Sequence, residues 1–187
     1  MTIHSTAIDG LLVIEPSVYT DDRGYFFEHY NKKAFRKMTG VAANFVQDNE
    51  SSSMAGTIRG LHFQVPPFEM GKLIRVVNGS VLDVAVDLRV GSPTFGRHAS
   101  VVLSAQNKRQ MWVPPGFAHG FLALEDDSIV SYKCSTYYNR DSERCLRWND
   151  PDLGIDWGVD KPLLSEKDAN SPLFREFDSP FIYSDEP

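Results

Sequence analysis

The stretch that decides the fold is "VPPGFAHGF", residues 113–121. It lies within a longer run, 109–124, that is rich in strand-forming residues and is interrupted by proline and glycine. Pro114, Gly116 and His119 follow the spacing P-x-G-x-x-H, so a histidine stands inside an otherwise apolar segment. This stretch predicts a turn followed by a strand that carries one group suited to binding or chemistry.

A second strand-like stretch, "IRGLHFQ" (58–64), also carries polar groups that are costly to desolvate. Arg59 and His62 either face a lined cavity, where they do chemistry, or lie on the surface of an ordinary sheet. Side chains alternate between the faces of a strand, which puts the two residues on opposite faces unless Gly60 forms a bulge.

The composition is that of an ordinary globular protein of one domain, predicted over residues 1–187. The chain has 187 residues, of which 42% are hydrophobic and 24% charged. A formal net charge of -6 argues against nucleic acid as a partner. The longest apolar run near the N-terminus, residues 11–14, is too short for a signal peptide or a membrane span, so no membrane partner is expected. The two cysteines, Cys134 and Cys145, are too few for a disulfide framework or a thiolate metal site, and we interpret them as small buried hydrophobic residues of a cytoplasmic protein.

Most of the chain is predicted to form short strands. Residues 81–88 and 98–104 are rich in β-branched side chains, and Asn78-Gly79 is typical of a β-hairpin turn. Helices are predicted only near Asn31, where the basic run reads as a solvated face, and near 165–169. Many short strands with turn signals indicate an all-β sandwich or barrel.

The alternation within two strands indicates which residues share a lining. In residues 81–89, Asp83 and Asp87 fall on one face and apolar residues on the other; a barrel with a polar interior explains this, but the stretch alone favours a solvent-facing sheet. In residues 128–138, Tyr132 and Tyr138 share a face and lie roughly 20 Å apart on an ideal strand. That span suits an elongated ligand such as a sugar joined through a diphosphate to a base.

The spacing in residues 113–121 resembles the second conserved motif of cupin-type jelly-roll barrels. In metal-binding cupins the first motif supplies H-x-H followed by a glutamate. The comparable stretch here is His62-Phe63-Gln64, with the next acidic residue at Glu69. Glutamine is a poor substitute for imidazole at a divalent metal site, so no metal is expected.

Over nearly its whole length the sequence resembles the dTDP-4-dehydrorhamnose 3,5-epimerases, metal-free enzymes of dTDP-L-rhamnose synthesis with a cupin fold. The resemblance includes ten segments in the right order: "DDRGYFFE" (21–28), "NFVQDNESSS" (44–53), "IRGLHFQ", "GKLIRVV" (71–77), "GSVLDVAVDLR" (79–89), "SPTFG" (92–96), "VPPGFAHGF", "YKCSTYY" (132–138), "RWNDPDLGIDW" (147–157) and "LSEKDA" (164–169). It implies a jelly-roll β-barrel with a few short helices and no organic cofactor.

The implied reaction inverts C3 and C5 of dTDP-4-dehydro-6-deoxy-D-glucose. It needs a base on one face, an acid on the other and a cation near the enolate. By resemblance, His62 is the base, Tyr132 the acid and Lys72 the enolate stabiliser. Asp168 corresponds to the carboxylate that orients the histidine, although by itself it would read as a surface acid. His119 and Asp83 resemble a second imidazole–carboxylate pair whose role is open.

The resemblance also implies how the substrate is bound. Arg59 and Lys167 resemble positions that contact the diphosphate or sugar, and Tyr138 resembles the aromatic that stacks on thymine. The other implied substrate-binding residues are Lys72, His119, Glu143 and the loop residues Gln47, Asp48 and Asn49. Arg23, Phe26 and Glu28 match a segment that reaches the neighbouring subunit's site, which implies a homodimer.

Two other functions remain open at this point. Related enzymes invert only one carbon or act on a different dTDP-4-keto sugar, and they share the histidine, lysine and tyrosine positions. A cupin that binds sugar nucleotides without catalysis is the other alternative. Joint retention of His62, Lys72, Tyr132 and Asp168 argues against it, because a binding module needs no acid–base pair.

Overall fold

Short strands separated by turns make up most of the molecule. The computed structural model describes residues 1–184, so the last three residues of the domain predicted over 1–187 lie outside the described part. The strands within that part are β1 (Thr2–Ser5), β2 (Leu12–Glu15), β3 (Tyr19–Asp21), β4 (Gly24–Phe26), β5 (Gln47–Ser53), β6 (Ile58–Gln64), β7 (Lys72–Asn78), β8 (Ser80–Asp87), β9 (His98–Ser104), β10 (Gln110–Val113), β11 (Phe117–Ala123), β12 (Ser128–Cys134) and β13 (Glu143–Cys145).

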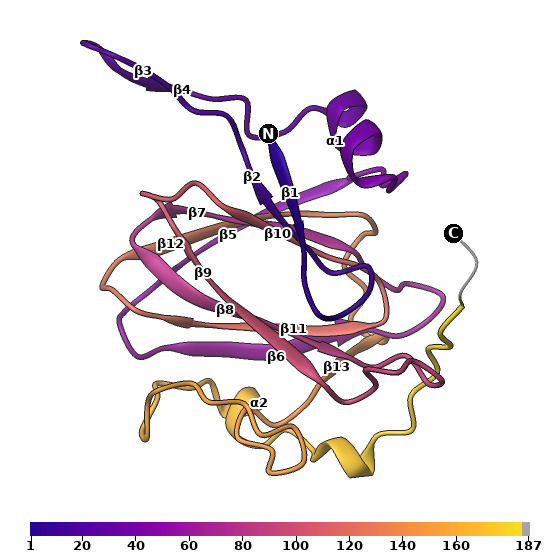
Figure 1. The fold of residues 1–187 in the computed structure, drawn as a ribbon. Helices are drawn as coiled ribbons and strands as arrows, with labels where there is room; N and C mark the ends of the chain where they lie inside the picture. The colour runs from indigo at the N-terminus through magenta and orange to yellow at the C-terminus, as the bar shows by residue number, and fades with distance from the viewer. Residues whose placement is uncertain (185–187) are drawn as a thin grey trace.

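Two antiparallel sheets face each other and enclose the interior (Figure 1). Within residues 1–184, one sheet has six strands in the order β1-β2-β10-β7-β12-β5, and the other has five in the order β13-β6-β11-β8-β9. The β3–β4 pair forms a separate ribbon. The predicted all-β barrel of the jelly-roll type is confirmed.

Both faces of β8 are buried. Val81 and Ala85 belong to the core cluster between the sheets, whereas Val84 and Val86 pack with Trp157 on the opposite side. The segment that follows β13 (Glu143–Cys145) covers that side of the five-stranded sheet (Figure 1). The alternation predicted over 81–88 is present, but the solvent-facing interpretation is wrong: the face that carries Asp83 and Ala85 is buried between the two sheets, as the polar-interior alternative expected, and the C-terminal segment covers the apolar face.

The turn at Asn78-Gly79 is a corner between the sheets. β7 lies in the six-stranded sheet and β8 in the five-stranded sheet, and the two strands do not pair. Gly79 has φ +70°, and a Cβ there would come within 2.5 Å of Ser128 Oγ. The hairpin predicted here is wrong: the turn residues were identified, but the strands after them diverge to bury their apolar faces in different layers.

Two short α-helices occur in the described residues, as predicted. Helix α1 (Lys32–Thr39) begins at Asn31, whose side chain accepts hydrogen bonds from the backbone N–H groups of residues 33 and 34, and ends at Gly40 in the left-handed region. It buries Phe35 and exposes its basic face. Helix α2 (Glu166–Ala169) begins at Ser165, and a single 3₁₀ turn follows at Phe174–Glu176.

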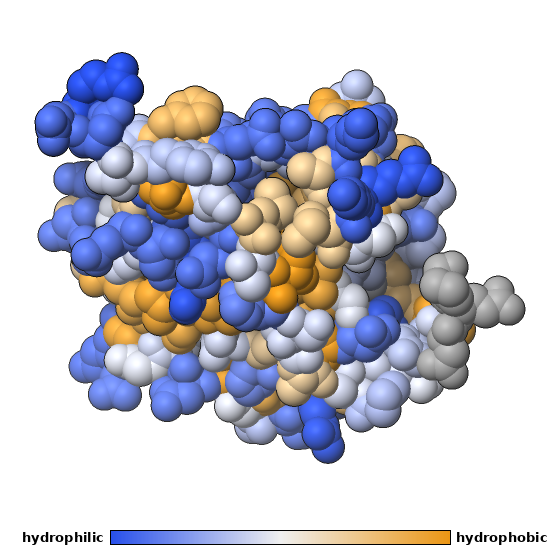
Figure 2. Space-filling view, turned by 45° about the horizontal axis from the view of Figure 1, so that its top comes forward, coloured by the Kyte–Doolittle hydropathy of each residue, from blue (hydrophilic) through white to orange (hydrophobic). Residues whose placement is uncertain are grey.

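The β3–β4 ribbon projects away from the two sheets (Figure 1). In the space-filling view it stands out at the upper left with a hydrophilic tip (Figure 2). Tyr19, Tyr25 and Phe26 on this ribbon are 67%, 60% and 71% exposed. None of the helices in the described part of the chain is long and apolar enough to cross a membrane.

Candidate active site

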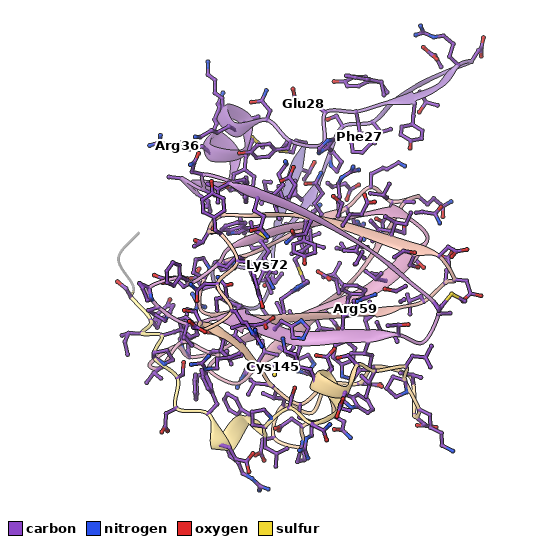
Figure 3. All side chains as sticks on the ribbon, turned by 180° about the vertical axis from the view of Figure 1, so that it is seen from behind. Phe27, Glu28, Arg36, Arg59, Lys72 and Cys145 are labelled. Carbon is purple, nitrogen blue, oxygen red and sulfur yellow. The ribbon has the colours of Figure 1, made fainter. Side chains whose placement is uncertain are left out.

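Two adjoining cavities lie between the sheets. The inner cavity, of about 280 Å³, is lined by Ser51, Arg59, His62, Lys72, His119, Phe121, Tyr132, Ser165 and Asp168. The outer cavity, of about 140 Å³, is lined by Gln47, Asn49, His62, Phe63, Gln64, Met70, Lys72, Tyr132, Tyr138 and Glu143. The two share His62, Lys72 and Tyr132, and Figure 3 shows Lys72 in the space between the sheets.

A bulge in β6 turns Arg59 and His62 toward the same cavity. On the neighbouring strand β11, His119 pairs with His62 but Phe121 pairs with Arg59, so the register shifts by one residue between them. Gly60 allows this because it has φ +131° and lies so close to Gly120 that a Cβ would come within 2.5 Å of its Cα. The β6 bulge that would put Arg59 and His62 on one face is therefore present.

His62 is oriented by a buried carboxylate. Its Nε2 lies 2.5 Å from Asp168 Oδ1, which comes from α2, and Asp168 is 3% exposed. Burial raises the pKa of Asp168, but hydrogen bonds from His62, Ser165 and the Gly60 backbone outweigh it and lower that pKa below its ordinary value. The carboxylate is therefore ionised and able to hold the proton on Nε2, which leaves Nδ1 as the basic nitrogen.

Lys72 and Tyr132 approach the cavity from the opposite sheet. Lys72 begins β7 and Tyr132 lies on β12, whereas His62 lies on β6 of the facing sheet. Lys72 Nζ donates a hydrogen bond to the His62 carbonyl oxygen at 3.3 Å. Burial lowers the pKa of Lys72 and raises that of Tyr132, so the phenol keeps its proton at neutral pH.

His119 and Asp83 form a second imidazole–carboxylate pair. His119 Nε2 lies 2.8 Å from Asp83 Oδ1, and their side chains are 8% and 0% exposed. His119 stands directly opposite His62 on the paired strands β11 and β6. The pair suggested by the sequence is thus brought together on the wall of the inner cavity.

A chain of polar contacts connects residues at the mouth of the outer cavity. Lys167 Nζ lies 2.7 Å from Glu143 Oε2, and the Tyr138 hydroxyl donates to the same oxygen at 3.2 Å. The backbone N–H of Tyr138 donates to Gln47 Oε1 at 3.0 Å. Because β12 ends at Cys134, the shared alternation of Tyr132 and Tyr138 on one strand is wrong, although both residues line the outer cavity.

Four of the expected binding residues lie away from these cavities. Asp48 points to the outer face of the six-stranded sheet and pairs with Lys133 at 2.9 Å, because β5 alternates Gln47 and Asn49 inward with Asp48 outward. Arg23, in the turn of the projecting ribbon, and Phe26, on its second strand, lie outside both cavities. Glu28, which accepts a hydrogen bond from Asn31, lies beside α1 and far from Lys72 and Arg59 (Figure 3).

Some lining residues were not identified from the sequence. Ser51 follows Gln47 and Asn49 in the inward alternation of β5, so strand parity could have revealed it. Phe121 and Ser165 gave no comparable signal, because their positions depend on the β6 bulge and on where α2 packs.

The position of the cupin metal motif is occupied by an amide with a structural role. Gln64 Nε2 donates to the carbonyl oxygens of Phe68 and Tyr137, and its Oε1 accepts from the Asn139 backbone N–H. Across residues 1–184, no group of three or more His, Cys, Asp or Glu side chains is arranged to hold a metal ion.

The comparisons with known proteins agree on one family. The family model described as dTDP-4-dehydrorhamnose 3,5-epimerase matches residues 5–176. A dTDP-4-dehydrorhamnose 3,5-epimerase of Pseudomonas aeruginosa is 51% identical over 92% of this chain and 95% of its own. The structure of a dTDP-6-deoxy-D-glucose-3,5-epimerase from Legionella pneumophila in complex with dTDP-4-keto-L-rhamnose is 45% identical, with a TM-score of 0.94 over 98% of both chains.

A relative with a narrower reaction is more distant. The 3'-monoepimerase ChmJ from Streptomyces bikiniensis, solved with dTDP-quinovose, is 38% identical, with a TM-score of 0.86 over 91% of this chain and 86% of its own. The match to the family model over most of the chain and the identities near one half decide the assignment. This chain is an isomerase that belongs to the dTDP-4-dehydrorhamnose 3,5-epimerase family.

Proposed function

We propose that this protein inverts C3 and C5 of dTDP-4-dehydro-6-deoxy-D-glucose to give dTDP-4-dehydro-L-rhamnose. The observation that carries the proposal is the placement of His62 and Tyr132 on facing sheets, on either side of one cavity. Inversion requires that a proton leave one face of a carbon and another arrive on the opposite face. Identity is also higher to the 3,5-epimerases than to the monoepimerase.

In the proposed reaction, His62 Nδ1 removes the proton from C3 or C5. The C–H electron pair forms a C=C bond to C4, and the ketone oxygen becomes an enolate. The Lys72 ammonium stabilises that oxygen where its charge develops. Tyr132 then donates its phenolic proton to the same carbon from the opposite face, the ketone re-forms, and proton exchange with solvent restores both residues.

The nucleotide part is proposed to occupy the outer cavity. Tyr138 is 54% exposed at its mouth and offers a ring face for thymine. Arg59, on the wall of the inner cavity, and Lys167, paired with Glu143 beside the outer cavity, supply positive charge toward the diphosphate or sugar. Gln47, Asn49, Glu143 and His119 offer polar contacts on the walls. Arg59 is held in place by Ser53 Oγ and the Ser52 carbonyl oxygen, both at 3.0 Å.

We further propose a homodimer in which the β3–β4 ribbon docks on the second subunit. Its aromatic residues Tyr19, Tyr25 and Phe26 are each at least 60% exposed, and exposed apolar surfaces of this kind mark protein interfaces. Arg23, Phe26 and Glu28 would then contribute to the neighbouring site. Phe26→Asp should convert the dimer to monomers in sedimentation experiments and should lower kcat/KM. A wild-type monomer would contradict the proposal.

We place the reaction in the cytoplasm. Cys134 and Cys145 are both free, as expected of a reducing compartment.

The proposed activity is tested by incubating the protein with dTDP-4-dehydro-6-deoxy-D-glucose in deuterium oxide. Reduction of the product and identification of the sugar should give the L-rhamno configuration, with deuterium at both C3 and C5. Deuterium and inversion at only one carbon would make the protein a monoepimerase. Tight binding with no exchange would make it a binding protein.

A further inference from the structure

Ser51 carries a polar group that the proposed mechanism does not use. Strand β5 directs Asn49, Ser51 and Ser53 toward the interior. Asn49 Nδ2 lies 3.6 Å from Cys134 Sγ, and Ser53 Oγ accepts a hydrogen bond from Arg59. The Ser51 hydroxyl between them is buried and has no hydrogen-bond partner within residues 1–184. It is the member of this polar row that is left unsatisfied.

An unsatisfied buried hydroxyl needs an explanation. Burying a hydroxyl without a partner costs free energy that the rest of the fold must offset, so most such groups in proteins are paired. Ser51 also lines the inner cavity together with His62, Lys72 and Tyr132. An oxygen kept free of partners beside the reacting groups is suited to bind a polar atom of the substrate.

We propose that Ser51 Oγ forms a hydrogen bond with the C2 hydroxyl of the sugar and so makes the enzyme selective for substrates that carry it. This inference rests on the proposed function, which places the sugar ring in the inner cavity. The C3 hydroxyl changes face during inversion, so a group fixed on a strand can serve it in only one configuration. C2 is not adjacent to the ketone and keeps its configuration, which lets one fixed partner serve its hydroxyl throughout the reaction.

The test compares wild-type protein and Ser51→Ala with dTDP-4-dehydro-6-deoxy-D-glucose and its 2-deoxy analogue. Ser51→Ala should lower kcat/KM for the parent sugar about tenfold, as expected for one hydrogen bond. The wild-type protein should lose a similar factor when given the 2-deoxy analogue. Ser51→Ala should lose nothing further with that analogue, because the contact is already absent.

Two controls separate this role from a structural one. Ser52→Ala removes an exposed hydroxyl on the opposite face of the same strand and keeps the backbone carbonyl that holds Arg59, so turnover of both substrates should be unaffected. The melting temperature of Ser51→Ala should stay the same or rise, because the variant removes a buried group without a partner.

The outcomes are distinguishable. The role of Ser51 is overturned if Ser51→Ala loses the same factor in kcat/KM on both substrates, whether or not its melting temperature falls. It is also overturned if the variant loses nothing on either substrate. If wild-type protein turns over neither sugar, the proposed function itself fails and the inference with it. Turnover of the parent sugar together with a loss specific to its C2 hydroxyl supports both.

Discussion

His62 and His119 stand opposite each other on paired strands, yet they differ in access to the cavity. The His62 side chain is 31% exposed and contacts Asp168, which lies on α2 outside the sheet. The His119 side chain is 8% exposed and contacts Asp83, which lies on β8 of the same sheet. The more open imidazole is the one whose second nitrogen can meet a substrate carbon. This difference favours His62 as the base.

His62→Asn and Tyr132→Phe should each reduce turnover by about 10²- to 10⁴-fold with little effect on folding. In deuterium oxide they should differ. Without His62 no enolate forms, so neither C3 nor C5 should take up deuterium. Without Tyr132 the histidine can still exchange a proton on one face, and NMR should show deuterium with little inversion. The opposite pattern would reverse the two roles.

Lys72→Met should lower kcat by about 10²- to 10³-fold, because the enolate loses its cationic partner. Burial lowers the pKa of Lys72 from 10.5, so wild-type activity should decline at an alkaline pH below 10.5 as the ammonium loses its proton. The pKa of Tyr132 is shifted upward from 10.0 by burial, so the phenol does not account for a decline below pH 10. Lys133→Met, on the outer face of the same sheet, should leave the pH profile unchanged. A decline that persists in Lys72→Met would assign it to another group.

Tyr138→Ala should weaken binding of dTDP by about 1–3 kcal/mol, the range found for base stacking on an aromatic ring in nucleic-acid sites. Calorimetry with dTDP alone measures this apart from the chemistry. The neighbouring Tyr137 is 66% exposed and does not line the cavity, so Tyr137→Ala serves as the matched control. Unchanged dTDP affinity with a collapse in turnover would instead make Tyr138 part of the chemistry.

Asp87→Asn should lower the free energy of unfolding by about 3 kcal/mol at pH 7, because Arg89 loses the buried carboxylate that it contacts at 2.8 Å. Burial raises the pKa of Asp87, but hydrogen bonds from Arg89, Ser92 and Thr94 outweigh it and lower that pKa. Because the pKa of Asp87 is lower in the folded protein than the unfolded value near 3.8, the ionised carboxylate stabilises the fold at pH values above 3.8. That contribution is lost as the pH falls through the folded-state pKa. Urea titrations should therefore show the gap between wild-type and variant narrowing below about pH 4.

The same Asp-x-Arg spacing on the projecting ribbon provides the control for this prediction. Asp21 and Arg23 form an exposed pair, and exposed ion pairs contribute little to stability. Asp21→Asn should leave the unfolding free energy nearly unchanged. A large loss there, or none at Asp87, would contradict the role of burial.

Exhaustive chelation should leave turnover unchanged, because the amide of Gln64 stands where cupins place a metal-binding histidine and is engaged with backbone groups. The measurement is the rate after dialysis against EDTA, with and without added divalent ions. Loss of rate that a divalent ion restores would overturn the metal-free mechanism.

The sequence alone determined the local features of this protein. Asn31 and Ser165 begin their helices because their short polar side chains accept hydrogen bonds from the first backbone N–H groups, and that depends on neighbours only. The alternation along β8 was equally readable, since successive side chains on a strand point to opposite faces. The resemblance in ten segments predicted the family, which the comparisons confirm, and supplied the candidate site residues.

Only the tertiary structure decided what those features face. Whether Asn78-Gly79 joins paired strands depends on which sheet each strand enters, and whether the face of β8 that carries Asp83 meets solvent depends on the second sheet that packs against it. Asp168 reaches His62 from 106 positions away, a distance that no local pattern encodes. The physical reason is that packing between layers and the pairing of buried charges are long-range, whereas propensity and alternation are properties of adjacent residues.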